Sequence, residues 1–256
     1  MAKKQTRSPL REKPLRNPGQ SLDEEIEHLG DDMLTPFLYA IVFLSMAILA
    51  WQEYITKKPQ NPYTSTVIAL ALIGWAIFKI SKLRRKMNSL KMARDGEKIV
   101  GQELENLRKG NCSIFHDIKG DKFNLDHVII SSNGIFVIET KTYSKPVKGE
   151  ANVFYDGKKI LVNGYTPDRD PLKQVEANVN WLREVLKKST GKIFPVKGVV
   201  VFPGWFVDNK QAKGSAIWVL NPKALASFIP NEPVTIQDTD VHLVAFHLSK
   251  YIRLPN

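Results

Sequence analysis

Two long uncharged runs near the N-terminus constrain this chain more than any other feature. Met33–Gln52 and Pro59–Phe78 are each 20 residues long and contain no Asp, Glu, Lys or Arg. A helix of about 20 largely apolar residues is long enough to cross the hydrocarbon core of a bilayer. The second run begins with polar residues, so we expect its span to start near Tyr63 and Lys79 to reach the far interface. The sequence therefore predicts a transmembrane helical hairpin over residues 33–80.

The alternative for these runs is a helical hairpin buried in a soluble core. Apolar residues surround both predicted helices instead of forming one stripe, which favours lipid over a one-sided protein core. Six basic residues precede the first span, seven lie in residues 79–94, and two separate the spans. The positive-inside rule then places both termini in the cytoplasm of a multi-pass inner or plasma membrane protein. Residues 79–94 contain no acid, and we expect them to bind anionic lipid as well.

Charge and cysteine content narrow the class of protein further. The net charge of +11 favours an anionic partner, either nucleic acid or a lipid surface. A single cysteine, Cys112, excludes a disulfide scaffold and a cysteine-rich zinc site. We divide the chain into an N-terminal cytoplasmic arm (1–32), the hairpin (33–80), a basic juxtamembrane linker (81–94) and a cytoplasmic domain (95–256). The arm is expected to be partly disordered, with a short amphipathic helix over residues 21–29 that begins with a capping box of Ser21 and Glu24.

The domain of residues 95–256 is long enough for one hydrophobic core and predicts a mixed α/β sheet flanked by helices. Asp170, Pro171 and Gly191 have the residue types and positions that begin and end a helix. Asp156-Gly157 marks a β-hairpin. The expected elements are helices over 95–110, 170–191 and 238–253, strands over 111–119, 123–131, 134–141, 195–203 and 216–221, and the hairpin over 153–163.

The most informative stretch is the predicted hairpin around Asn133-Gly134, a dipeptide typical of two-residue type I′ turns. That turn places Ser132 opposite Ile135 and Asp126 opposite Lys141. Side chains alternate between the two faces of a strand. The residues expected on one face of the sheet are Asp126, Val128, Val137, Glu139 and Lys141.

Charged groups in such apolar strands are costly unless they are paired or bind a metal. One interpretation is a cross-strand ion pair of Asp126 with Lys141, with Glu139 reaching solvent. The other is that Asp126 and Glu139 hold a hard divalent cation, because Mg²⁺ binds one or two carboxylates and keeps waters and phosphate oxygens as further ligands. Lys141 would then stand beside the attacking water. His127 points to the opposite face by parity, so we interpret it as a structural histidine.

Four segments of the domain resemble the nuclease-related domain (NERD) family, a branch of the PD-(D/E)xK nuclease superfamily with a restriction-endonuclease-like fold. The strand segments NLDHVII and GIFVIETK carry the most specific part of the resemblance. The four matching segments are DGEKIVGQELENL (95–107), NLDHVII (124–130), GIFVIETK (134–141) and DPLKQVEANVNWL (170–182).

The resemblance implies a role for six residues. Asp126 matches the metal-binding aspartate, Glu139 and Lys141 match the E-x-K pair, and the carbonyl of Thr140 is an additional candidate ligand. Glu97 matches the glutamate of the first helix; its alternative role is a favourable charge at the N-terminus of that helix. Gln174 matches the glutamine of the second core helix; its alternative role is an exposed polar residue on an amphipathic helix.

The expected function is hydrolysis of DNA phosphodiester bonds with Mg²⁺, or Mn²⁺ in its place, by a membrane-tethered domain, for DNA processing or the handling of mobile or foreign DNA. The alternative is a non-catalytic module that binds nucleic acid or protein at the membrane. RNA is a further candidate substrate. The sequence contains no P-loop, no Ser-His-Asp order and no G-x-G-x-x-G motif, which argues against nucleotide-cofactor and acyl-transfer chemistry.

Overall fold

The computed structural model describes residues 12–56, 61–110, 112–120, 123–147 and 149–253. The chain forms two compact units. One is Ser21–Met92, and the other joins the N-terminal residues up to Gln20 to Ala93–Asn256.

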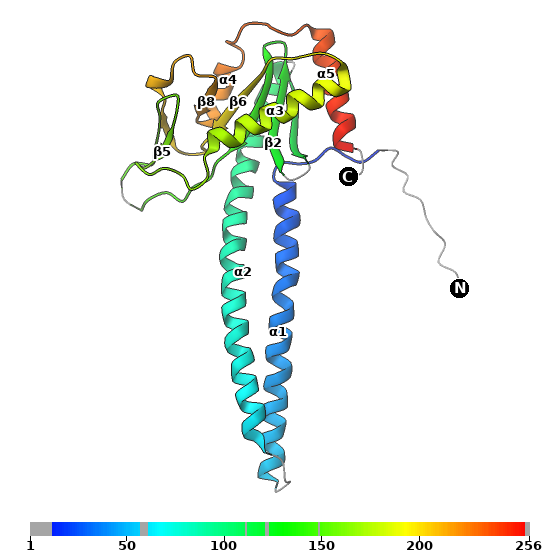
Figure 1. The fold of residues 1–256 in the computed structure, drawn as a ribbon, viewed down its shortest axis with the longest axis vertical. Helices are drawn as coiled ribbons and strands as arrows, with labels where there is room; N and C mark the ends of the chain where they lie inside the picture. Colours follow the sequence, from blue (N-terminus) through cyan, green and yellow to red (C-terminus); the bar gives the residue numbers. More distant parts are fainter. Residues whose placement is uncertain (1–11, 57–60, 111, 121–122, 148, 254–256) are drawn as a thin grey trace, which may run out of the picture. The chain divides into compact units, whose positions relative to one another are not determined.

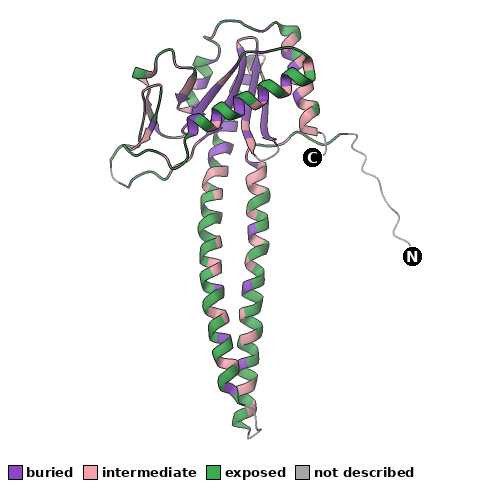
Figure 2. Ribbon diagram, viewed as in Figure 1, coloured by how far each residue is buried: buried purple, intermediate pink, exposed green. Residues whose placement is uncertain are grey.

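The first unit is a pair of long helices, α1 (Gln20–Ile55) and the greater part of α2 (Pro62–Glu105), which run side by side (Figure 1). Trp51 donates its indole N–H to the hydroxyl of Thr66 at 2.9 Å and packs edge-on against Tyr63. Small residues such as Ala47 and Ala69 are buried, and most of the larger apolar side chains remain exposed. Figure 2 shows this exposure along both helices.

Both helices contain an apolar window long enough to cross a membrane, and only 11% of each window is buried. A core helix of a soluble protein would be mostly buried, so the alternative of a hairpin inside a soluble core does not fit. Both helices are longer than expected. The predicted helix over residues 21–29 and the first apolar run form one helix with Pro36 inside it. The predicted linker over residues 81–94 is helical and lies within α2, because basic residues are good helix formers and no Gly or Pro interrupts this segment.

The second unit is built on a five-stranded sheet with the strand order β1-β2-β3-β6-β8. The first three strands are antiparallel, and β6 and β8 continue the sheet in parallel with β3. The expected mixed α/β sheet is confirmed. The strands are β1 (Ser113–Lys119), β2 (Asn124–Ser131), β3 (Gly134–Thr140), β6 (Val196–Val201) and β8 (Ile217–Leu220).

Helices cover both faces of this sheet and create two hydrophobic clusters. On one face, α3 (Pro171–Thr190) and α5 (Asp238–Arg253) contribute buried residues such as Val175 and Val244 to a cluster with Val128 and Val137. On the other face, the last turns of α2 and the short helix α4 (Leu225–Phe228) pack against Ile129. Figure 1 shows α3 crossing the sheet, and Figure 2 shows how completely the central strands are buried.

The helix signals read from the sequence are largely correct. Asp170 caps α3 by accepting from the N–H of Leu172, Pro171 is in the first turn, and Gly191 ends the helix in the left-handed conformation. The predicted first helix ends earlier than Gly110, because α2 stops at Glu105 and a 3₁₀ turn, η1 (Asn106–Gly110), follows.

A second, three-stranded sheet has the order β5-β4-β7. The hairpin expected around Asp156 supplies β4 (Asn152–Tyr155) and β5 (Ile160–Val162), and β7 (Phe206–Asp208) adds in parallel to β4. β7 and the two short 3₁₀ turns η2 (Lys210–Ala212) and η3 (Pro222–Ala224) were not expected from the sequence.

The register predicted for the β2–β3 hairpin is wrong. Ser131 pairs with Gly134, so the turn is Ser132–Asn133, and neither turn residue has the positive φ that a type I′ turn needs. Contacts from residues 232–236 hold this turn: the N–H groups of Thr235 and Ile236 donate to the carbonyl of Ser132, and the Asn133 amide donates to the carbonyl of Glu232 at 2.6 Å.

The corrected register moves the partner of each β2 residue by two positions. Val128 pairs with Val137, and the continuation of this register places Asp126 opposite Glu139 instead of Lys141. A shift of two residues keeps every side chain on its face of the sheet. The predicted grouping of Asp126, Glu139 and Lys141 on one face is therefore preserved.

The structure describes the N-terminal arm from residue 12 onward; residues 1–11 and 57–60 lie outside the described residues. That the arm is partly disordered stays a prediction. Asn17–Gln20 forms a turn closed by a 3.2 Å hydrogen bond from the N–H of Gln20 to the carbonyl of Asn17, with Gly19 at φ +70°. Helix α1 begins directly after this turn, one residue before the predicted capping box of Ser21 and Glu24. Arg16, just before the turn, pairs with Asp117 of β1 at 2.6 Å, so this part of the arm belongs to the sheet domain.

Candidate active site

A hydrogen-bonded group of polar side chains lies where β3 ends against α3. The ammonium group of Lys141 donates to Glu139 Oε1 at 2.9 Å and to Gln174 Oε1 at 2.7 Å. The amide of Gln174 donates to the same Glu139 oxygen at 2.6 Å, and the amide of Asn178 donates to Glu139 Oε2 at 3.1 Å. Glu139 is 3% exposed. A buried carboxylate therefore accepts three N–H donors.

Asp126 lies on the neighbouring strand and contacts the same segment of chain. Its Oδ2 accepts a 2.7 Å hydrogen bond from the backbone N–H of Thr140. That N–H belongs to the residue between Glu139 and Lys141, so the aspartate is fixed next to both of them. The predicted ion pair between Asp126 and Lys141 is wrong, because the ammonium group pairs with Glu139, and Glu139 does not reach solvent.

Glu97 joins this group from α2. Its side chain is buried, and the charges of Asp117 and Glu139 both act on its carboxyl group. Its alternative role at a helix N-terminus is excluded, because α2 starts at Pro62 and Glu97 lies far inside the helix. Gln174 is likewise no solvent-facing residue, since it bridges Lys141 and Glu139.

Burial and mutual repulsion make the ionised form of these acids unfavourable. Burial, with the charges of Asp117 and Glu139, raises the pKa of Glu97 to about 8. Burial first, then the charges of Glu139 and Glu97, raises the pKa of Asp126 well above its usual range. Burial also raises the pKa of Glu139, and Lys141 and Asn178 oppose that rise. Such perturbed carboxyl groups are concentrated at functional sites.

The donor set suits a hard divalent cation, which would relieve the repulsion between the carboxylates. Asp126 and Glu139 are oxygen ligands of the kind that Mg²⁺ takes, and Mg²⁺ commonly uses only one or two carboxylates with waters and phosphate oxygens. In the described part of the chain, no three His, Cys, Asp or Glu side chains come together in an arrangement that could hold a metal ion. Asp126 and Glu139 are the two carboxylates of this group that could hold such a cation.

His127 points to the opposite face, as expected, and is fully buried. Its Nδ1 lies 2.8 Å from Nδ1 of His116 on β1. Burial and the neighbouring imidazole lower the pKa of His127 well below its usual range, so it is neutral. The pair is a structural contact between two strands, which agrees with the prediction for His127.

Sequence reasoning missed three residues of this region. Asn178 was detectable, since it lies four positions after Gln174 and therefore on the same face of a helix. Asp117 was harder to find, because its φ of 49° breaks the regular alternation of β1. Arg16 carried no local signal, since its partner Asp117 is 101 residues away in the sequence.

Two known proteins resemble parts of this chain. An uncharacterized protein of Bacillus anthracis is 34% identical over 59 residues, which is 21% of this chain and 28% of that protein. The solved structure of Pyrococcus furiosus SfsA in complex with Ca²⁺ aligns with 54% of this chain and 55% of that chain at 18% identity, with a TM-score of 0.26. The chain thus covers 28% of the first protein and 55% of the second. Neither similarity carries an argument about the chemistry of this chain.

The family comparison is more specific. Residues 93–203 match the family model described as NERD, nuclease-related domain. This range contains Glu97, Asp126, Glu139, Lys141 and Gln174, and the mixed sheet with helices on both faces is consistent with the PD-(D/E)xK fold expected for the family. The chain is therefore similar to the nuclease-related domain family over residues 93–203, a range that begins in the last turns of α2.

Proposed function

We propose that this protein is a membrane-anchored, divalent-metal-dependent nuclease that hydrolyses phosphodiester bonds in DNA. The observation that carries the proposal is the buried group in which Glu139 accepts from Lys141, Gln174 and Asn178 while Asp126 accepts from the backbone between Glu139 and Lys141. The match to the nuclease-related domain supports the same reaction class.

Each residue has a role that follows from its chemistry. Asp126 and Glu139 would hold Mg²⁺ or Mn²⁺, with the Thr140 carbonyl as a further ligand. The bound metal would polarise the phosphate and lower the pKa of water. Lys141 supplies a fixed positive charge for the negative charge that develops on the phosphate in the transition state.

The remaining polar residues act through their neighbours. Gln174 holds the ammonium group of Lys141 and one oxygen of Glu139, so it is a positioning residue. Asn178 fixes the second oxygen of Glu139. Glu97 is mostly protonated at neutral pH, because its pKa is about 8. In its protonated form Glu97 can donate a hydrogen bond or a proton within the site. A bound cation would favour its ionised form.

The two apolar helices support a membrane location. We propose that they cross the inner or plasma membrane as a hairpin, because their apolar windows are long and only 11% of each window is buried. The seven basic residues of 79–94 against two between the spans favour cytoplasmic termini and a cytoplasmic nuclease-related domain. The same basic segment would contact anionic lipid.

One observation favours the alternative of a non-catalytic binding module. Both oxygens of Glu139 already accept hydrogen bonds from protein donors, so the carboxylate is satisfied without a metal. A domain that had lost catalysis could keep such a network for stability alone. Metal binding and cleavage distinguish the two functions directly.

The test is cleavage of supercoiled plasmid and linear DNA by the full chain in neutral detergent, with Mg²⁺, Mn²⁺ or EDTA, and with an RNA of the same sequence in parallel. We expect cleavage of DNA with metal and none with EDTA. Lys141→Ala should abolish it, and Lys188→Ala, which removes an exposed lysine at the end of α3, should not. Wild type that binds Mn²⁺ and DNA but never cleaves would establish the binding-module function instead.

A further inference from the structure

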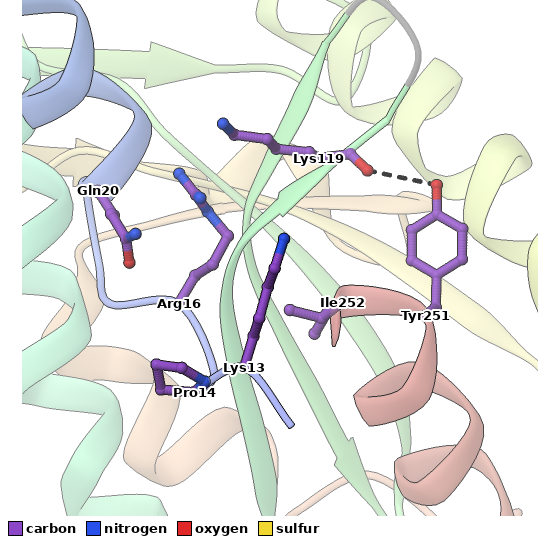
Figure 3. Close-up of a pocket in the computed structure, with 7 residues that line it drawn as sticks. All are labelled: Lys13, Pro14, Arg16, Gln20, Lys119, Tyr251 and Ile252. Atoms are coloured by element: carbon purple, nitrogen blue, oxygen red, sulfur yellow. Dashed lines mark hydrogen bonds between the residues drawn. The ribbon is translucent and has the colours of Figure 1, made fainter. Parts of the chain in front are cut away.

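A basic pocket lies between the N-terminal arm and the end of the sheet domain. Its volume is about 350 Å³, within the range of about 300–1,000 Å³ that is usual for ligand pockets. Three of the lining residues are basic and none is acidic. Figure 3 shows the side chains of Lys13 and Arg16 extending from the arm toward Lys119 of β1. The lining residues are Lys13, Pro14, Arg16, Gln20, Lys119, Tyr251 and Ile252.

Contacts between distant parts of the chain build this pocket. Glu12 forms ion pairs with Lys250 and Arg253, which fix the arm to the last turn of α5. The hydroxyl of Tyr251 donates to the carbonyl of Lys119 at 3.3 Å and joins α5 to β1 (Figure 3). The arm, α5 and β1 are therefore joined to one another around the pocket, and its basic side chains come from two of these segments.

The pocket is connected to the candidate active site through Arg16. The guanidinium group lines the pocket and pairs with the buried carboxylate of Asp117 at 2.6 Å. Asp117 in turn interacts electrostatically with Glu97, which also interacts with Glu139. The β1 residues on either side of Asp117 pair with His127 and Leu125, which flank Asp126 on β2. A ligand that contacts Arg16 would therefore be two side chains, Arg16 and Asp117, away from Asp126.

We propose that this pocket binds the sugar-phosphate backbone of a nucleic-acid strand next to the active site. The inference rests on the proposed function and specifies where its substrate is held. Lys13, Arg16 and Lys119 give the pocket its positive charge, which attracts a phosphate group. The ring of Tyr251 packs edge-on against Trp181, so the pocket offers no stacking platform for a base. Contacts of this kind position a strand without reading its sequence.

The test measures binding separately from cleavage. Fluorescence anisotropy of labelled single-stranded and duplex DNA is recorded with the full chain in neutral detergent and EDTA, over a series of salt concentrations. The variant is Lys13→Ala combined with Lys119→Ala. The control combines Lys158→Ala with Lys159→Ala, which removes two exposed lysines of the β4–β5 loop. Arg16 is left intact, because it neutralises a buried aspartate.

Each phosphate contact contributes about 0.9 to the slope of log K against log salt for duplex DNA and about 0.7 for single strands. We therefore expect the pocket variant to lower the slope by about 1.8 for duplex and about 1.4 for single strands, equally for unrelated sequences. Lys13→Ala alone, on the exposed arm, should give half the change and covers the case in which the double variant fails to fold.

Unchanged slopes in Lys13→Ala and in a folded double variant would overturn the inference. So would a double variant that loses binding of short-chain phosphatidylglycerol but keeps its affinity for DNA, because the pocket would then be a lipid headgroup site. The two proposals fail separately. Wild type that never cleaves while the pocket variant loses DNA binding refutes the nuclease but supports the pocket, and cleavage with unchanged binding does the opposite.

Discussion

Glu97 makes the stability of the metal-free protein depend on pH in a direction that can be measured. Its pKa is about 8 in the folded protein against an ordinary value of 4.5. Between these two pH values the folded state keeps a proton that the unfolded chain has lost. Folding then takes up a proton, so the free energy of unfolding falls as the pH rises from 4.5 to 8. The contribution of Glu97 to the stability is therefore greatest at the acidic end of this window.

The size of the effect follows from the same two values. One pKa unit corresponds to about 1.4 kcal/mol, so the window from 4.5 to 8 corresponds to at most about 5 kcal/mol for an isolated group. Glu97→Gln cannot ionise and keeps an oxygen that can accept from Gly19. The variant should match wild type near pH 5 and exceed it by several kcal/mol at pH 8.5. In melting temperature the gap is on the order of 10 °C for a domain of this size.

The assay is thermal unfolding of the full chain in neutral detergent with EDTA at pH 5.5, 7 and 8.5, followed by near-ultraviolet circular dichroism. Glu176→Gln, which removes an exposed carboxylate from α3, is the control and should show no pH-dependent gap. Adding Mg²⁺ should narrow the gap for Glu97→Gln, because a cation favours the ionised carboxylates of wild type. A gap between Glu97→Gln and wild type that stays constant from pH 5.5 to 8.5 would refute the reasoning.

Three further predictions concern the site and the membrane. Lys141→Ala should lower the cleavage rate by about 10²–10³ while Mn²⁺ affinity in calorimetric titration stays at the wild-type value, because an ammonium group is no metal ligand; cleavage at the wild-type rate would contradict this role. Asp126→Asn should weaken Mn²⁺ binding and leave the metal-free protein at least as heat-stable as wild type, because it removes one of several repelling carboxylates; unchanged affinity in both Asp126→Asn and Glu139→Gln would show that the acids are structural. Reporter fusions near Lys58 and after Asn256 should give an exported and a cytoplasmic signal respectively, and an exported signal from the C-terminal fusion would rule out the topology.

Local patterns predicted most of the sheet domain. The strands, the caps of α3 and the mixed sheet depend on residues close together in the sequence, and these were found. The turn of the β2–β3 hairpin was misplaced because it is held by Glu232, Thr235 and Ile236, about a hundred residues away. The face of Asp126 and Glu139 was still correct, since the register error was an even number of residues.

In the candidate site, too, residues with a local sequence signal were predictable and residues placed by distant contacts were not. Gln174 was found from a resemblance, and the spacing of four residues to Asn178 was visible in the sequence but not used. The position of Glu97 inside a helix was missed because residues 81–94 were expected to be a linker, which made Glu97 part of a first turn. These residues are helical, and α2 extends back to Pro62. The ion pair of Arg16 with Asp117 joins two segments that lie on either side of the apolar helices in the sequence, so no local sequence pattern predicts it.

That link makes the sheet domain discontinuous in the chain. Residues up to Gln20 and residues from Ala93 onward form one unit, and the helical hairpin Ser21–Met92 is inserted between them. If the insertion were a flexible loop, bringing its ends together would cost about 4 kcal/mol in chain entropy. Within the hairpin, Lys86 pairs with Glu25 at 2.7 Å and brings its two ends together. Because both helices precede Ala93 in the chain apart from the last turns of α2, a nascent chain can complete the domain only after the whole hairpin has been synthesised.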